Sequence, residues 1–188
     1  LGRLFPFEHI PDCEITTLTD HSEKTSAESV FVCIRGVRFD GHTLAPRAYE
    51  RGCRIFVAEE PLDLPPDACV LLTPNSRKTL SELACTLWGD PSQKMHVIGI
   101  TGTKGKTTTA TMLSHILNSV GIPTGYIGTN GISYSSVERT TANTTPDCLE
   151  MQKALREMRD SGITDVVIEV SSQALWKKRT YGLSFDIC

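Results

Sequence analysis

Residues 95–108 read MHVIGITGTKGKTT, and this stretch decides the fold that the rest of the chain must fit. The apolar run at 95–100 predicts a buried strand, and apolar residues within 113–120 recur at the spacing that lines one face of a helix. Between them lies a glycine-rich segment whose backbone N–H groups can turn toward phosphate oxygens at the start of that helix. A strand, such a loop and a helix in this order predict a site for a nucleoside triphosphate.

The residues of this loop have distinct expected roles. Lys106 can reach the β- and γ-phosphates of ATP, and the Thr107 hydroxyl can ligate Mg²⁺. Ile100 stands where the common pattern has its first glycine, and a simple glycine-rich turn is the alternative interpretation. The strand before the segment and the helix after it favour the phosphate loop. The expected ATP-binding residues are Gly102, Thr103, Lys104, Gly105, Lys106, Thr107 and Thr108.

Glu169 is the second element of the expected site. It follows the apolar run 166–168, which predicts another buried strand. Ligands of doubly wound sheets bind at the carboxyl ends of the strands, so a carboxylate there is suited to hold Mg²⁺. An exposed charge at a strand end is the alternative. We predict Thr107 and Glu169 as metal ligands, and Lys106 and Glu169 as catalytic residues.

Strands and helices alternate along the whole chain, which predicts the α/β class. The polar segment 89–94 contains glycine and proline and is expected to link two domains, residues 1–88 and residues 95–188. In the second domain, residues 133–142 are interpreted as a hairpin. Thr145 and Pro146 are interpreted as the cap and first residue of a helix. The fold prediction is a small α/β domain followed by part of a doubly wound, phosphate-loop domain.

Composition narrows the function classes. Apolar residues make up 39% of the 188 residues, enough for a core, and the net charge of −3 gives no indication of a nucleic-acid partner. No apolar run reaches the roughly 18 residues of a membrane span, and no signal peptide opens the chain, so we expect a cytoplasmic protein. The seven cysteines contain no Cys-x-x-Cys pair and are interpreted as buried, reduced thiols. The start at Leu1 and the apolar end predict a piece of a longer protein.

Three segments, in order, resemble the Mur ligase family. They are GITGTKGKTT at 99–108, NTTP at 143–146 and EVSSQAL at 169–175. The first half is similar too, with FVCIRG at 31–36 followed by Asp-Gly at 40–41. The segments are most similar to those of the members that add the third amino acid to UDP-N-acetylmuramoyl-L-Ala-D-Glu.

The resemblance implies an ATP- and Mg²⁺-dependent ligase of peptidoglycan synthesis. Its first domain would bind the UDP part of the substrate. Its ATPase domain would phosphorylate the D-Glu carboxylate, and the amine of lysine or diaminopimelate would then attack the acyl phosphate. Val37, Arg38 and Phe39 align with a further substrate loop. His21 and Glu23 replace the family's usual neighbours of Ser22, and Lys177 stands where many members have glutamine. The implied contacts to the UDP-muramoyl dipeptide are Ser22, Asn143, Thr144, Thr145, Ser171 and Arg179.

The resemblance also implies what this chain alone does not contain. In the family, the second metal site and the domain that selects the amino acid lie further along the chain, so we expect these 188 residues to be inactive by themselves. The expected partners are a UDP-muramoyl dipeptide and a free amino acid, and the expected state is a monomer. The alternatives are another member of the superfamily, such as a folylpolyglutamate synthase-like enzyme or an amidotransferase subunit, and a nucleotide-binding module without catalysis.

Overall fold

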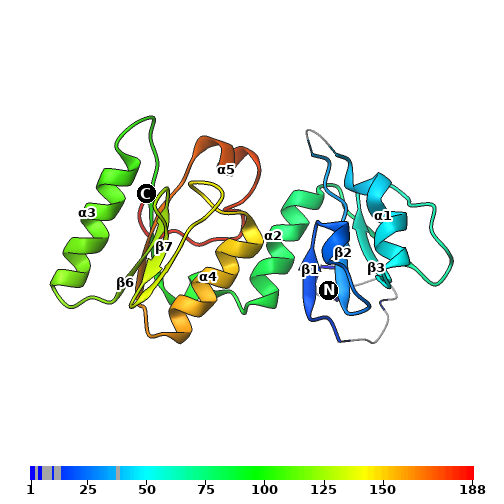
Figure 1. Cartoon of the computed structure of the whole chain (residues 1–188), viewed down its shortest axis with the longest axis horizontal. Coiled ribbons are helices and arrows are strands. Elements are labelled where there is room, and N and C mark those ends of the chain that lie inside the picture. Colours follow the sequence, from blue (N-terminus) through cyan, green and yellow to red (C-terminus); the bar gives the residue numbers. More distant parts are fainter. Residues whose placement is uncertain (3, 6–9, 11–13, 37–38) are drawn as a thin grey trace. The chain divides into compact units, whose positions relative to one another are not determined.

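The computed structural model describes residues 1–2, 4–5, 10, 14–36 and 39–188. The chain divides into two compact units, Leu1–Leu83 and Ala84–Cys188, and each unit has its own sheet and core (Figure 1). Val37 and Arg38 of the expected substrate loop lie outside the described residues, as does Cys13. None of the described helices has the length and hydropathy that crossing a membrane requires.

The first unit is built on a four-stranded parallel sheet in the order β1-β2-β3-β4. Phe31 on β2 and Phe56 on β3 pack edge to face, with ring centroids 6.2 Å apart, and Ala45 and Ala48 of α1 belong to the same core. The alternating strands and helices that the sequence predicts are therefore present. The elements of this half are β1 (Thr17–Thr19), η1 (Ser22–Lys24), β2 (Ser29–Val32), α1 (Gly41–Glu50), β3 (Ile55–Ala58), β4 (Cys69–Leu72) and α2 (Ser76–Leu87).

Two cysteines of the first unit behave as small apolar residues. Cys33 and Cys53 are fully buried, and neither forms a disulfide. Burial, together with the nearby Asp40 carboxylate, raises the pKa of the Cys33 thiol to about 12, so this thiol stays protonated at neutral pH. Both observations agree with the interpretation of reduced, structural thiols for these two residues. The prediction of burial is wrong for Cys69, which is half-buried, and for Cys188, which is exposed.

The second unit is built on a five-stranded mixed sheet in the order β5-β9-β6-β7-β8. β5, β9 and β6 are parallel, and β6, β7 and β8 are antiparallel to one another in turn. The hairpin that the sequence predicts at 133–142 is formed by β7 and β8. The elements are η2 (Pro91–Lys94), β5 (His96–Ile100), α3 (Lys106–Ser119), β6 (Thr124–Gly128), β7 (Gly131–Tyr134), β8 (Val137–Arg139), α4 (Cys148–Asp160), β9 (Asp165–Glu169) and α5 (Ser172–Trp176).

Helices cover both faces of this sheet. Val166 and Ile168 of β9 pack in a core with Met151 and Leu155 of α4, whereas Val167 packs in a second core with Ala110 of α3. Figure 1 accordingly shows α3 and α4 on opposite sides of β6 and β7. Burial on both faces explains why β9 is a continuous apolar run. The carboxyl end of β9 lies at the edge of the sheet where parallel strands present ligand sites. The α/β class that the sequence predicts is confirmed.

The division between the units falls inside α2, between Leu83 and Ala84. The segment 89–94, whose polar composition predicts a linker, lies within the second unit. Ser92 in this segment is buried, and its hydroxyl accepts a hydrogen bond from the Ser184 N–H at 3.3 Å. The polar composition of 89–94 reflects a 3₁₀ turn, η2, that begins with Pro91.

The predicted helix cap at Thr145 is wrong. Helix α4 begins at Cys148, and its cap is Asp147, whose carboxylate accepts a hydrogen bond from the Glu150 N–H at 2.9 Å. Thr145 is fully buried instead and connects two loops of the candidate site. A proline two residues before the start of a helix carries the same sequence signal as a proline at its first position.

Candidate functional site

The phosphate loop connects β5 to α3, as the sequence predicts. Residues 101–105 are exposed, and no side chain among the described residues caps the first turn of α3, whose N–H groups therefore remain open to an anion. The Lys106 ammonium donates a hydrogen bond to the Gly102 carbonyl at 2.8 Å, which folds this side chain back over the loop. The segment combines a helix N-terminus, a lysine and exposed backbone, which are the features that bind phosphate.

Two glycines allow the loop to take this path. Gly102 has φ 141° and Gly105 has φ 82°, both in the region that residues with a side chain rarely adopt. Gly105 immediately precedes the first residue of α3, so its left-handed conformation sets the angle at which the loop enters the helix. A side chain at either position would strain the loop where the backbone must approach a ligand closely.

Glu169 ends β9 and is fully buried. Its Oε1 accepts hydrogen bonds from the Tyr126 hydroxyl at 2.5 Å and from the Thr129 N–H at 3.0 Å. Its Oε2 accepts from the Thr107 hydroxyl at 2.9 Å and lies 3.2 Å from the Thr129 hydroxyl. The alternative of an exposed charge at a strand end is therefore wrong for Glu169. The structure brings this carboxylate and the phosphate-loop threonine together.

Tyr126, Gly128 and Thr129 are neighbours of Glu169 that the sequence analysis did not assign to the site. Burial raises the pKa of the Tyr126 phenol to about 12, and the hydrogen bond to Glu169 adds to this effect, so the phenol remains a donor. The signal was present, because β6 neighbours β9 in a parallel arrangement and its carboxyl end must lie beside Glu169. The order of the strands was the missing information.

The segments expected to contact substrate meet beside Glu169. The buried Thr145 hydroxyl donates to the Glu169 carbonyl at 2.7 Å and accepts from the Ser171 N–H at 3.0 Å. Arg179 donates to the Thr145 carbonyl at 2.8 Å, and the Thr144 hydroxyl accepts from the Thr129 hydroxyl at 3.1 Å. The five expected residues 143–145, 171 and 179 thus belong to one loop cluster, in which the Thr145 side chain has a structural role.

Three expected substrate residues differ in how their side chains are placed. Asn143 is exposed, and Ser171 caps α5 through the Ala174 N–H. Ser22 begins η1 in the first unit and is buried, with 5% of its surface exposed. Asn143 is therefore the most accessible of these three, and Ser22 has little surface with which to contact a ligand.

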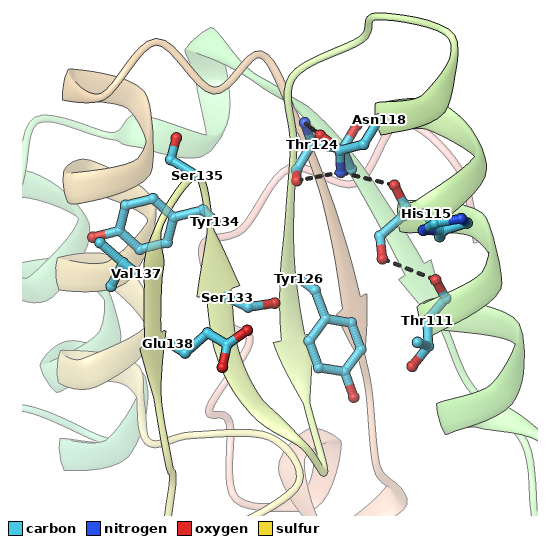
Figure 2. Close-up of a pocket in the computed structure, with 11 residues that line it drawn as sticks. Thr111, His115, Asn118, Thr124, Tyr126, Ser133, Tyr134, Ser135, Val137 and Glu138 are labelled. Carbon is cyan, nitrogen blue, oxygen red and sulfur yellow. Dashed lines mark hydrogen bonds between the residues drawn. The ribbon is translucent and has the colours of Figure 1, made fainter.

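A polar groove of about 430 Å³ lies between α3 and the β7–β8 hairpin. Figure 2 shows Tyr126 on β6 between Thr111 and His115 of α3 on one side and Ser133 and Glu138 of the hairpin on the other. Among the described residues, those that the sequence assigned to a site do not line this groove. Its connection with the candidate site is Tyr126, whose hydroxyl reaches Glu169.

Thr145→Val tests the structural role of this hydroxyl. The substitution keeps the side-chain shape and leaves the Glu169 carbonyl and the Ser171 N–H without their partner, which costs about 1–3 kcal/mol for each buried group left unsatisfied. We expect the free energy of unfolding, measured by urea denaturation, to fall by an amount in this range. The matched control is the exposed Thr140→Val, which should change it by less than about 0.5 kcal/mol. Equal effects of the two variants would contradict the structural role.

Oxygen atoms dominate the ligands that this site can offer to a metal. In the described part of the chain, no group of three or more His, Cys, Asp or Glu side chains is arranged to hold a metal ion. The Thr107 hydroxyl and one carboxylate, that of Glu169, meet at 2.9 Å beside the phosphate loop. This set suits a hard cation that receives its other ligands from phosphate and water.

Two family models match the chain and together span most of it. The Mur ligase middle domain matches residues 100–188, and the catalytic domain model of the Mur ligase family matches residues 14–86. The first match includes the phosphate loop, Glu169 and the loop cluster around Thr145.

Curated relatives carry ligase names. The UDP-N-acetylmuramoyl-L-alanyl-D-glutamate–2,6-diaminopimelate ligase of Geobacillus kaustophilus is 38% identical over 183 residues, which are 97% of this chain and 37% of the relative. The enzyme of the same name from Lactiplantibacillus plantarum is 39% identical over 176 residues, 94% of this chain and 35% of the relative. The chain therefore spans little more than a third of the length of these relatives.

A solved structure of a ligase with that same name has a similar fold. It superposes with a TM-score of 0.78 at 22% sequence identity, over 98% of this chain and 38% of that structure. At this identity the likeness concerns the fold, and it covers both units.

Proposed function

Because this chain belongs to the Mur ligase family, we propose that it is the UDP-substrate-binding and ATP-binding part of an acid–amino-acid ligase. The reaction proposed is the addition of diaminopimelate or lysine to the D-Glu of UDP-N-acetylmuramoyl-L-Ala-D-Glu in peptidoglycan precursor synthesis. The observation that carries this proposal is the 2.9 Å contact between Thr107 of the phosphate loop and the buried Glu169, in a chain whose relatives bear that enzyme's name.

The chain's own residues would bind and neutralise the triphosphate. The N–H groups of 102–108 and the N-terminus of α3 would bind the β- and γ-phosphates, and Lys106 would leave the Gly102 carbonyl to meet them. The γ-phosphoryl group would pass to a D-Glu carboxylate oxygen with ADP leaving. The amine would then attack the carbonyl carbon, lose a proton and expel phosphate. Positioning and charge neutralisation suffice for both steps, so no protein nucleophile is needed.

Thr107 and Glu169 would hold Mg²⁺. Their donor atoms fit this ion, because Mg²⁺ takes oxygen ligands and is commonly bound by one or two carboxylates plus the phosphates of a substrate. When bound, the ion would neutralise charge on the transferring phosphoryl group. The hydrogen bonds to Glu169 Oε1 satisfy one oxygen of this buried carboxylate and leave Oε2 on the side of Thr107.

The remaining roles follow from the same family. The first unit would bind the uridine end of the substrate, with Ser22 in that region, and Asn143, Thr144, Ser171 and Arg179 would contact the muramoyl peptide. The partners would be the UDP-muramoyl dipeptide and a free amino acid, and the protein would act as a monomer in the cytoplasm. The exposed Asn143 supports this assignment more strongly than the buried Ser22 does.

A phosphate-release assay tests the proposed reaction. We expect the protein in its natural full length to release phosphate from ATP only when UDP-muramoyl dipeptide and an amino acid are both present. Parallel assays with diaminopimelate and with lysine identify the amino acid. Turnover with a folate and glutamate instead would favour a folylpolyglutamate synthase-like enzyme. Nucleotide binding without any acceptor-dependent turnover would favour a non-catalytic module.

A further inference from the structure

The two oxygens of Glu169 are held in different ways. Oε1 accepts from two donors that the fold fixes, the Tyr126 phenol at 2.5 Å and the Thr129 N–H at 3.0 Å. Within the described part of the chain, Oε2 meets only the hydroxyls of Thr107 and Thr129, whose hydrogen atoms can rotate away. The carboxylate therefore has one oxygen directed into the protein and one directed toward the phosphate loop.

The space around Oε1 excludes a side chain at the neighbouring position. A Cβ atom at Gly128 would lie 2.3 Å from Glu169 Oε1 and 2.3 Å from the Tyr126 hydroxyl oxygen, closer than real Cβ contacts. Gly128 does not have a positive φ, so its backbone conformation does not explain the glycine. The absent side chain makes room for the contact between Tyr126 and Glu169.

We propose that Tyr126 is a positioning residue that holds Glu169 Oε1 inward, so that Oε2 faces Thr107 and is free to ligate a divalent cation. The proposal rests on the proposed function, in which Glu169 is a metal ligand. Hydrogen-bond partners of metal ligands fix the orientation of those ligands, and their loss commonly lowers metal affinity by about 10- to 100-fold. Thr129 contributes the second fixed donor through its backbone, which no substitution of its side chain removes.

Tyr134 is a second buried tyrosine of this sheet and provides a matched control. Its hydroxyl lies 3.5 Å from Glu157 Oε2, on a carboxylate that Arg139 also contacts at 2.8 Å. Tyr126 and Tyr134 have 5% and 7% of their surface exposed, so a phenylalanine keeps a buried ring at either position. Of these two tyrosine hydroxyls, it is that of Tyr126 that contacts Glu169.

The test compares the coupling between metal and nucleotide in Tyr126→Phe and Tyr134→Phe. Calorimetric titration of ADP without metal and with saturating Mn²⁺ gives the factor by which the metal strengthens ADP binding. We expect Tyr126→Phe to reduce this factor by about 10-fold while metal-free ADP affinity stays close to wild type. Tyr134→Phe should leave the factor unchanged. A purely structural role of Tyr126 would shift metal-free and metal-bound affinities together.

Glu169→Gln in the same titration separates this inference from the proposed function. If Glu169→Gln reduces the Mn²⁺ factor and Tyr126→Phe does not, Tyr126 is not a positioning residue although Glu169 is a metal ligand. If Glu169→Gln leaves the factor intact, the proposed metal site itself is refuted, and this inference is refuted with it. A reduced factor in both variants, with Tyr134→Phe unchanged, supports the proposal.

Discussion

Replacement of Lys106 by alanine should lower ATP-dependent ligation by the full-length protein about 1,000-fold, because one preorganised charge on a transferring group contributes on this scale. The ammonium group is partly exposed and is bonded only to the loop carbonyl of Gly102 in the described contacts. Removal of Lys106 therefore deprives the phosphates of a charge and leaves the core of the second unit intact. Steady-state kinetics with a coupled phosphate assay measure the effect.

The control for this loss is Lys153→Ala. Lys153 lies on α4, and its partner is Glu157 at 4.0 Å, a surface pair of small energetic value. It should retain nearly wild-type turnover and the same thermal unfolding as Lys106→Ala. Turnover near that of wild type in Lys106→Ala would show that residues 102–108 do not bind the reacting phosphates.

Glu169→Gln should raise the Mg²⁺ concentration required for half-maximal turnover by at least about 100-fold, since loss of a direct ligand should cost no less than loss of its outer-shell partners. The amide keeps an oxygen for the Tyr126 phenol and the Thr129 N–H. Its NH₂ group would face the Thr107 and Thr129 hydroxyls, which can accept as well as donate. The fold therefore tolerates the variant, and the change lowers the affinity for Mg²⁺.

Glu157→Gln is the control for this second prediction. Glu157 accepts from Tyr134 and pairs with Arg139, away from Glu169 and its donors. A magnesium titration of turnover should be unchanged in this variant. If Glu169→Gln also gave an unchanged titration, the buried carboxylate would serve only to join β6 to β9 and α3.

Much of the fold could be predicted from the sequence because its signals are local. The apolar runs that became β5 and β9, the helical spacing of α3 and the hairpin of β7 and β8 each lie within one short window. The same holds for the phosphate loop, whose glycines need positive φ at Gly102 and Gly105. Glu169 could be assigned because it ends an apolar run, and the structure places it against Thr107.

The rest required knowledge of which strands are neighbours. Tyr126 and Thr129 reach Glu169 only because β6 pairs with β9, a long-range arrangement that no local pattern specifies. Thr145 was misinterpreted as a helix cap for a related reason, since its partners at 169 and 171 are distant in sequence. Short strands give weak signals as well, and the three-residue β1 was not predicted.

The central claim is that the phosphate loop and Glu169 together form a metal–nucleotide site. Diffraction from crystals grown with a nonhydrolysable ATP analogue and Mn²⁺, collected at a wavelength where manganese scatters anomalously, tests it most directly. The account predicts phosphate density along residues 102–108 and a manganese peak within ligand distance of both Thr107 Oγ1 and Glu169 Oε2. Phosphates bound elsewhere, or a manganese peak that Glu169 does not contact, would contradict it.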